Sequence, residues 1–225
     1  MTQTEKQKLN EQRIRKEQIF RAGQPSKFNI LAFDQAAKCG VAWQFAGETE
    51  IHYEMWDVSV SAKTKRLGKQ ELFHEVVKAT TDKTKQRRWK KGDVVKDKVI
   101  AKDWDYHKYS SFDNRLREFL AKHPQFQYVG YEGIQGKSQI VKNSSAGFRA
   151  IICKGDDYKT IELPITSVKK FATGKGKVDD RASGKLEMIQ ACKELWGIET
   201  EDDNIADAVH LLMYLKSIIN HKFNQ

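Results

Sequence analysis

The pattern of hydrophobic and polar positions predicts a polar helix and then three strands in the N-terminal part of the chain. Residues 1–24 are mostly polar and charged, and Gly23-Gln24-Pro25 would end the weak helix that their few apolar positions predict. Three runs rich in β-forming residues follow, separated by short polar segments: 28–34, 39–45 and 50–59. We therefore expect a helical extension over 1–26 and then an antiparallel meander.

Helices and strands alternate in the rest of the chain. Apolar residues recur at helical spacing in four segments: 111–122, 138–154, 185–196 and 201–219. Strand-like runs precede the second and third of these helices, at 126–132 and 159–165, and a lysine-rich segment follows the later run. This order predicts an α/β domain of the RNase H-like class over 27–225, with a mixed sheet and flanking helices.

The chain has a local excess of positive charge. Its formal net charge is +10, which is typical of proteins with a polyanionic partner. Residues 61–102 contain 14 Lys or Arg against five acids, whereas the remaining residues carry 26 basic and 25 acidic groups. The segment is either a solvated charge run or a DNA-binding insertion. Aromatic and aliphatic residues interspersed among its cations favour an insertion over 61–105, with Arg87, Arg88, Lys90 and Lys91 as DNA contacts.

Several other classes of protein are disfavoured. The polar residues after Met1 do not form an export signal, and no apolar run approaches the about 18 residues of a membrane span, so we expect a cytoplasmic protein. The three cysteines form no Cys-x-x-Cys pair and the six histidines no i, i+4 pair, which argues against a disulfide framework and a zinc site.

Two acidic residues end predicted strands. Asp34 follows Ile30 and Ala32 on one face of its strand, where a carboxylate is costly unless a cation neutralises it, although an Asx turn would also explain an aspartate at this position. Glu132 repeats the arrangement on a later strand, before Gly133. Glutamate is uncommon in strands and does not favour turns, so a functional carboxylate competes here only with an exposed strand-end charge.

More acids lie at the start of the last helix. Thr200 and Asp203 have the spacing of a capping box, and acids in a first turn complement the helix dipole. Asp207 lies beyond that turn, one turn after Asp203, so the two carboxylates repel unless a cation lies between them. Carboxylates brought together from two strand ends and a helix would suit Mg²⁺ or Mn²⁺, and two such ions could support phosphodiester hydrolysis.

Three short segments resemble the acidic motifs of the RuvC Holliday-junction resolvases, in particular the phage-encoded ones. They are Asn29 to Asp34 with Gly40-Val41-Ala42, then Tyr131-Glu132-Gly133, then Asn204 to Ala208. The resemblance implies a metal-dependent endonuclease that cuts branched DNA, with Asp34, Glu132 and Asp207 as metal-binding acids. The family commonly has an Asp or His where this chain has Asn204, and we expect Asp203 to supply the fourth carboxylate, with Asp202 and Asn204 as alternatives.

The resemblance also implies lysines near the active site and a homodimer in the cytoplasm, that of the host if the gene is phage-borne. The candidate phosphate contacts are Lys169, Lys170, Lys175, Lys177 and Lys185, for which ordinary surface positions are the alternative. Gln135 stands where the family often has a base-stacking aromatic residue. Two other functions stay open: another RNase H-like nuclease or strand transferase, and a noncatalytic protein that binds branched DNA.

Overall fold

The computed structural model describes residues 3–59, 100–123, 125–133, 139–176 and 180–223, without the side chains of 100–107, 139–144 and 181. The chain divides into two compact units, residues 1–57 with 118–225 and residues 58–117, which are described separately. Most of the basic segment, including Arg87, Arg88, Lys90 and Lys91, lies outside the described residues. Lys177 and Gln135 also lie outside them.

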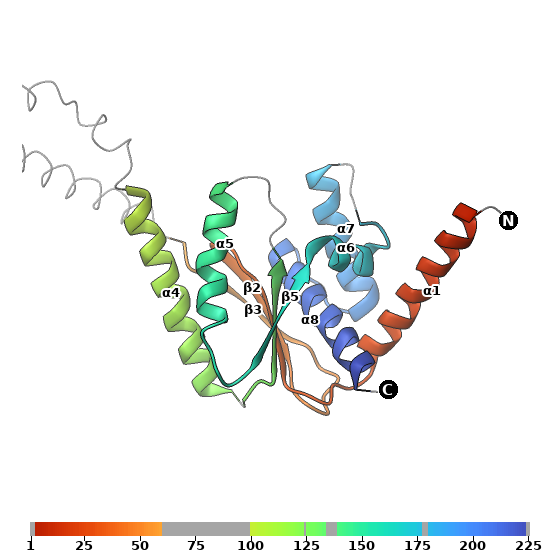
Figure 1. Cartoon of the computed structure of the whole chain (residues 1–225), viewed down its shortest axis with the longest axis horizontal. Coiled ribbons are helices and arrows are strands. Elements are labelled where there is room, and N and C mark those ends of the chain that lie inside the picture. Colours follow the sequence, from red (N-terminus) through yellow and green to blue (C-terminus); the bar gives the residue numbers. More distant parts are fainter. Residues whose placement is uncertain (1–2, 60–99, 124, 134–138, 177–179, 224–225) are drawn as a thin grey trace, which may run out of the picture. The chain divides into compact units, whose positions relative to one another are not determined.

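A five-stranded mixed sheet forms the centre of the larger unit (Figure 1). Its strands are β1 (Ile30–Asp34), β2 (Lys38–Gln44), β3 (His52–Asp57), β4 (Tyr128–Gly133) and β5 (Lys159–Pro164). The strand order is β3-β2-β1-β4-β5; β1 to β3 form the expected antiparallel meander, and β4 and β5 add parallel to β1. Parallel pairing of β1 with β4 brings the carboxyl ends of these two strands to the same edge.

The helices agree with the predicted order, with two corrections. They are α1 (Gln3–Gly23), α4 (Ile100–Lys122), α5 (Gln139–Ile152), α6 (Ile165–Thr173), α7 (Arg181–Trp196) and α8 (Asp203–Lys222). The lysine-rich connection contains the helix α6, which the sequence analysis missed because the cations obscure its short apolar face of Val168, Phe171 and Ala172. In addition, α4 begins at Ile100, within the segment that was assigned to the basic insertion.

The last helix, α8, is buried on most sides rather than along one narrow stripe. It packs across β1 and β2 on the sheet and also contacts α1 and α7 (Figure 1). Ile30 and Ala32 of β1 lie in the same core cluster as Val209 and Leu212 of α8. Because it packs against the core on several sides, α8 is apolar on several faces.

The start of α8 differs from the predicted capping box. Asp202 is the N-cap, and its side chain accepts hydrogen bonds from the Asn204 backbone N–H at 2.9 Å and from Asn204 Nδ2 at 2.8 Å. The Thr200 hydroxyl accepts from the backbone N–H of Asp202, one turn too early to cap the helix. Because Asp202 satisfies the end of the helix, Asp203 does not act as the partner in a capping box.

The N-terminal helix α1 packs against α8 (Figure 1). Ala22 near its end is fully buried, and Asn220 Nδ2 of α8 donates to the Arg21 carbonyl at 3.0 Å. These contacts attach α1 to the C-terminal part of the larger unit. Among the helices that the structure describes, none combines the length and apolar character needed to cross a membrane.

Candidate active site

Asp34 and Glu132 end the two central strands on the same face. The parallel register pairs Phe33 with Tyr131, so the following residues, Asp34 and Glu132, are neighbours across the strand ends. Ile30 and Ala32 precede Asp34 on the α8 side of the sheet, and Gly130 precedes Glu132 next to the Leu215 side chain of α8. Asp34 is only 8% exposed. The alternation of side chains along both strands therefore directs both acids toward α8.

Gln35 fixes the backbone of Glu132. Its Nε2 donates to the Glu132 carbonyl at 2.6 Å, and its Oε1 accepts from the Glu132 N–H at 3.0 Å. Gln35 is itself buried. This amide therefore continues the pairing of β1 with β4 past the last register pair and holds Glu132 beside Asp34. The role of Gln35 could not be predicted, since nothing in the sequence relates it to a residue 97 positions further along the chain.

The other two acids come from the first turns of α8. Gly40 of β2 lies so close to this helix that an added Cβ would stand 1.9 Å from the Asn204 carbonyl oxygen. Glycine at this position lets the start of α8 rest directly on the sheet. Asp203 and Asp207 on this part of the helix then come close enough to Asp34 for their charges to act on it.

Burial makes Asp34 and Glu132 difficult to ionise, and repulsion from neighbouring acids adds to the effect at Asp34. Burial raises the pKa of Asp34 well above its ordinary value, and the charges of Asp207, Glu132 and Asp203 raise it further. Burial also raises the pKa of Glu132, while a hydrogen bond from the Asp34 carboxyl group and the charge of Lys169 lower it. Ionisation of both Asp34 and Glu132 is therefore disfavoured, and a cation bound beside them would relieve it.

The pKa of Asp207 is raised by burial and by neighbouring acids in the same way as that of Asp34. Burial raises its pKa to about 7, with Glu132 and Asp203 adding to the shift and Lys169 and Lys185 opposing it. Within the part of the chain that the structure describes, its Oδ1 is buried and has no hydrogen-bond partner. A buried oxygen without a donor is costly, so this atom is suited to a ligand that supplies positive charge.

Only some of the candidate lysines lie near the acids. Lys185 of α7 forms an ion pair with Asp203, and the charge of Lys169 acts on both Glu132 and Asp207. Lys170 instead pairs with Glu11 of α1 at 3.1 Å, and Lys175 pairs with Glu187 of α7 at 3.0 Å. The structure thus brings Lys169 and Lys185 to the acidic cluster and gives Lys170 and Lys175 acidic partners elsewhere.

The acidic cluster, defined as Asp34, Glu132, Asp203 and Asp207, suits a hard divalent cation in its chemistry. Carboxylate oxygens are the ligands that Mg²⁺ and Mn²⁺ prefer. Among the described residues, however, no group of three or more His, Cys, Asp or Glu side chains is arranged to hold a metal ion. Within the cluster, Asp203 is paired with Lys185 of α7.

Asn204 and Asp202 are engaged with each other through the hydrogen bonds of the helix cap. Of the three alternatives for a fourth acid, Asp203 is the one whose charge raises the pKa of both Asp34 and Asp207.

Comparisons with known proteins reveal a likeness of fold. No protein-family model matches the sequence, and no curated protein matches it. Among solved structures, "Thermus thermophilus RuvC structure" superposes with a TM-score of 0.51 and 10% sequence identity, over 86% of this chain and 96% of that one. "T. thermophilus RuvC in complex with Holliday junction substrate" gives a TM-score of 0.52 and 11% identity, over 87% and 96% of the two chains.

The expected fold class is therefore confirmed. The mixed sheet with its meander and flanking helices is an RNase H-like fold, as found in the RuvC structures.

Proposed function

We propose that this protein is a divalent-metal-dependent endonuclease that cleaves branched DNA. One observation carries the proposal: carboxylates distant in sequence come near one another where β1, β4 and α8 meet. Burial raises the pKa of Asp34, Glu132 and Asp207, and repulsion from neighbouring acids adds to the shift at Asp34 and Asp207. Stability alone would not favour such a cluster, so a functional role explains it better. The likeness of fold to RuvC supports nuclease chemistry as that role.

Asp34, Glu132, Asp203 and Asp207 would hold Mg²⁺, or Mn²⁺ in its place, as a pair of ions. Bound there, the ions would supply Lewis acidity and lower the pKa of water for attack on a phosphodiester. Gln35 orients Glu132 through its backbone, and Lys169 and Lys185 place positive charge beside the acids. We assign these two lysines to the DNA phosphates on either side of the scissile bond.

The direct test is cleavage of a substrate panel in Mg²⁺ and in Mn²⁺. The panel contains a four-way junction, a Y-junction, a replication fork, a linear duplex and an RNA·DNA hybrid. The proposal expects cutting of the branched DNAs in preference to the duplex and the hybrid. It also expects Asp34→Asn to lose at least a thousandfold in cleavage rate while binding the junction with unchanged affinity.

Three results would contradict the proposal in different ways. Preferential cutting of the hybrid would indicate another RNase H-like nuclease. Binding of junctions without cutting by the unaltered protein would indicate a noncatalytic DNA-binding protein. Equal cleavage by the Asp34→Asn variant would place the active site elsewhere in the chain. Asp156→Asn, which removes an exposed carboxylate, is the matched control and should behave like the unaltered protein.

The proposal extends to a resolvase of the phage-encoded type that acts in the cytoplasm as a homodimer. Two copies would present two acidic clusters to the symmetric strands of a Holliday junction and nick each strand once. Sedimentation with and without junction DNA tests the dimer. Paired nicks within the lifetime of one complex would support it, and a monomer on the junction that makes single nicks would refute it.

A further inference from the structure

A cleft between α1 and α6, separate from the acidic cluster, has a strongly basic lining. It has a volume of about 670 Å³ and is lined by Lys8, Glu11, Gln12, Arg15, Lys16, Lys170, Thr173, Gly174 and Lys175. Five of these residues are cationic and one is acidic. We refer to this set of residues as the α1–α6 cleft.

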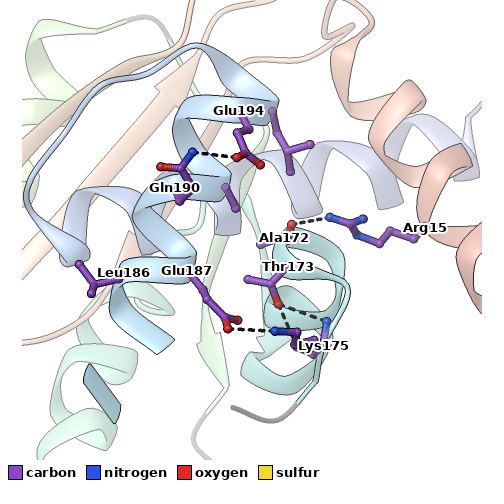
Figure 2. Close-up of a pocket in the computed structure, with 10 residues that line it drawn as sticks. Arg15, Ala172, Thr173, Lys175, Leu186, Glu187, Gln190 and Glu194 are labelled. Atoms are coloured by element: carbon purple, nitrogen blue, oxygen red, sulfur yellow. Dashed lines mark hydrogen bonds and ion pairs between the residues drawn. The ribbon is translucent and has the colours of Figure 1, made fainter. Parts of the chain in front are cut away.

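Arg15 fixes the geometry of the cleft. Its guanidinium reaches from α1 to the end of α6, where Nε donates to the Phe171 carbonyl at 2.9 Å and Nη2 to the Ala172 carbonyl at 2.6 Å. Figure 2, a close-up of a neighbouring pocket that shares Arg15, shows the bond to Ala172. The last carbonyls of a helix carry partial negative charge, so an arginine at this position stabilises the junction between the helices. The Lys170–Glu11 ion pair adds a second link between α1 and α6.

The cations of the cleft differ in how far they are neutralised. Lys170 pairs with Glu11, and Lys175 pairs with Glu187 of α7 (Figure 2). Among the described residues, Lys8 and Lys16 form no ion pair, and both are exposed. Because these two lysines have no acidic partner in the described part of the chain, the cleft keeps a net positive charge. Such a charge favours an anion with several phosphates over a small neutral ligand.

Helix α6 connects the cleft to the acidic cluster. Lys169 acts on Glu132 and Asp207, whereas the next residue, Lys170, lines the cleft. Successive residues of a helix point in directions about 100° apart, so α6 presents positive charge to both sites at once. The two adjacent lysines of α6 therefore link the acids to the cleft, and a DNA strand that passes the acids would reach the cleft along this helix.

From this arrangement we propose that the α1–α6 cleft binds the phosphate backbone of DNA beyond the scissile bond, with Lys8 and Lys16 of the N-terminal helix as direct phosphate contacts. The inference rests on the proposed nuclease function for the identity of the polyanion. It gives α1 a role in substrate binding that is separate from the carboxylate chemistry.

The test measures binding of a fluorescent four-way junction over a range of salt concentrations, in EDTA, so that it does not depend on cleavage. Lys8→Gln with Lys16→Gln removes two charges from the cleft. The matched control, Lys6→Gln with Arg13→Gln, removes two charges from the same helix outside the cleft. We expect the cleft variant to bind roughly tenfold more weakly and to lower the slope of log affinity against log salt by about one to two, and the control to change neither by as much.

A third variant should change junction binding in the opposite direction. Glu11→Gln removes the only acid of the cleft and releases Lys170 from its ion pair, so junction binding should become tighter. Unchanged melting temperatures for all three variants would show that folding is intact, since the substituted side chains lie at the surface of α1.

The outcomes separate this inference from the proposed function. Equal losses in the cleft and control variants, or no gain with Glu11→Gln, would overturn the inference while leaving nuclease activity untouched. Salt-dependent binding through the cleft without metal-dependent cleavage would uphold the inference and overturn the proposed function. Absence of any junction binding by the unaltered protein would overturn both.

Discussion

At the scale of single residues, the acidic cluster lowers the stability of the fold, because it places several carboxylates where they are poorly hydrated. Asp34 and Asp207 are held where water solvates them poorly, and the charges of neighbouring acids raise the pKa of both still further. An isolated buried charge is among the most costly features a fold can contain. Here the ammonium group of Lys185, which pairs with Asp203, and the charge of Lys169 limit that cost.

We predict that Asp207→Asn stabilises the protein in a pH-dependent way in EDTA. The folded-state pKa of Asp207 is raised to about 7, so the favourable protonated form is lost as the pH rises through that value, whereas the unfolded carboxyl ionises near pH 4. The amide of the Asp207→Asn variant does not ionise, so that variant does not lose stability as the pH rises. Its advantage in free energy of unfolding should grow between pH 4 and 7 to on the order of 2 to 4 kcal/mol.

Urea denaturation at pH 4, 5.5 and 8 checks this prediction. Mg²⁺ should stabilise the unaltered protein more than Asp207→Asn, because only the former keeps the full set of carboxylates. A stability difference that does not change with pH would mean that Asp207 ionises normally in the folded protein.

Gln35 gives a second prediction at the same scale. Gln35→Leu keeps the size of the side chain but leaves the Glu132 N–H and carbonyl without their partner, which should cost about 1 to 3 kcal/mol of stability. Because Glu132 then loses its orientation, the Mg²⁺ concentration for half-maximal cleavage should rise about tenfold or more.

Gln44→Leu is the control, since Gln44 is a buried amide for whose side-chain atoms the described residues provide no hydrogen-bond partner. Removing that amide should be neutral or stabilising. If both leucine variants changed the Mg²⁺ requirement alike, the effect would come from general packing and not from Gln35.

At the scale of elements, the site depends on how closely α8 approaches the sheet. The helix carries two of the four acids, and its first turns rest on β2 at Gly40. On its other side, α8 is held to α7 by His210, whose Nδ1 accepts from Trp196 Nε1 at 3.2 Å and whose Nε2 lies 3.0 Å from the Met188 carbonyl. Contacts on both sides thus fix the position of Asp203 and Asp207 relative to the strand ends.

We predict that Gly40→Ala disrupts cleavage more than folding. The new Cβ would overlap the Asn204 carbonyl oxygen, so the start of α8 must move away from the sheet. Such overpacking typically costs about 1 to 3 kcal/mol, and a shift of about 1 Å in the acids would lower the cleavage rate by about a hundredfold.

Thermal unfolding and cleavage kinetics measure the two effects. Gly23→Ala is the control, because an added Cβ there meets no atom within 4 Å, and it should leave both quantities nearly unchanged. Full activity of the Gly40→Ala variant would show that the approach of α8 to β2 does not position the acids.

At the scale of the whole molecule, charge is divided unevenly along the chain. The acids of the cluster belong to the larger unit, whereas the excess of positive charge lies in residues 61–102. A nuclease needs cations to hold a polyanion near its acids, and the basic segment supplies more of them than the α1–α6 cleft does.

We predict that this segment dominates the salt dependence of junction binding. Replacing Arg87, Arg88, Lys90 and Lys91 with Gln should lower the slope of log affinity against log salt by roughly two or more, through lost counterion release. The control removes four exposed lysines from the larger unit: Lys122, Lys154, Lys159 and Lys222. A slope that is the same for both variants would indicate a solvated charge run without a specific role.

The sequence by itself determined most of the elements and singled out the candidate acids. Strand and helix periodicities are local properties, so the meander, the later strands and most helices could be predicted from neighbouring residues alone. Asp34 and Glu132 were recognisable because each acid ends an apolar strand. Helix α6 was missed, since the lysines of this segment obscure its short apolar face.

Only the tertiary structure decided which groups meet. Gln35 contacts Glu132 across almost a hundred positions, Gly40 admits the start of α8, and Arg15 joins α1 to α6. The tertiary structure also decided which lysines lie near the acidic cluster and which pair with other acids. The physical reason is that charge repulsion, hydrogen bonding and close packing act between atoms that are near in space, and a linear order of residues does not specify those distances.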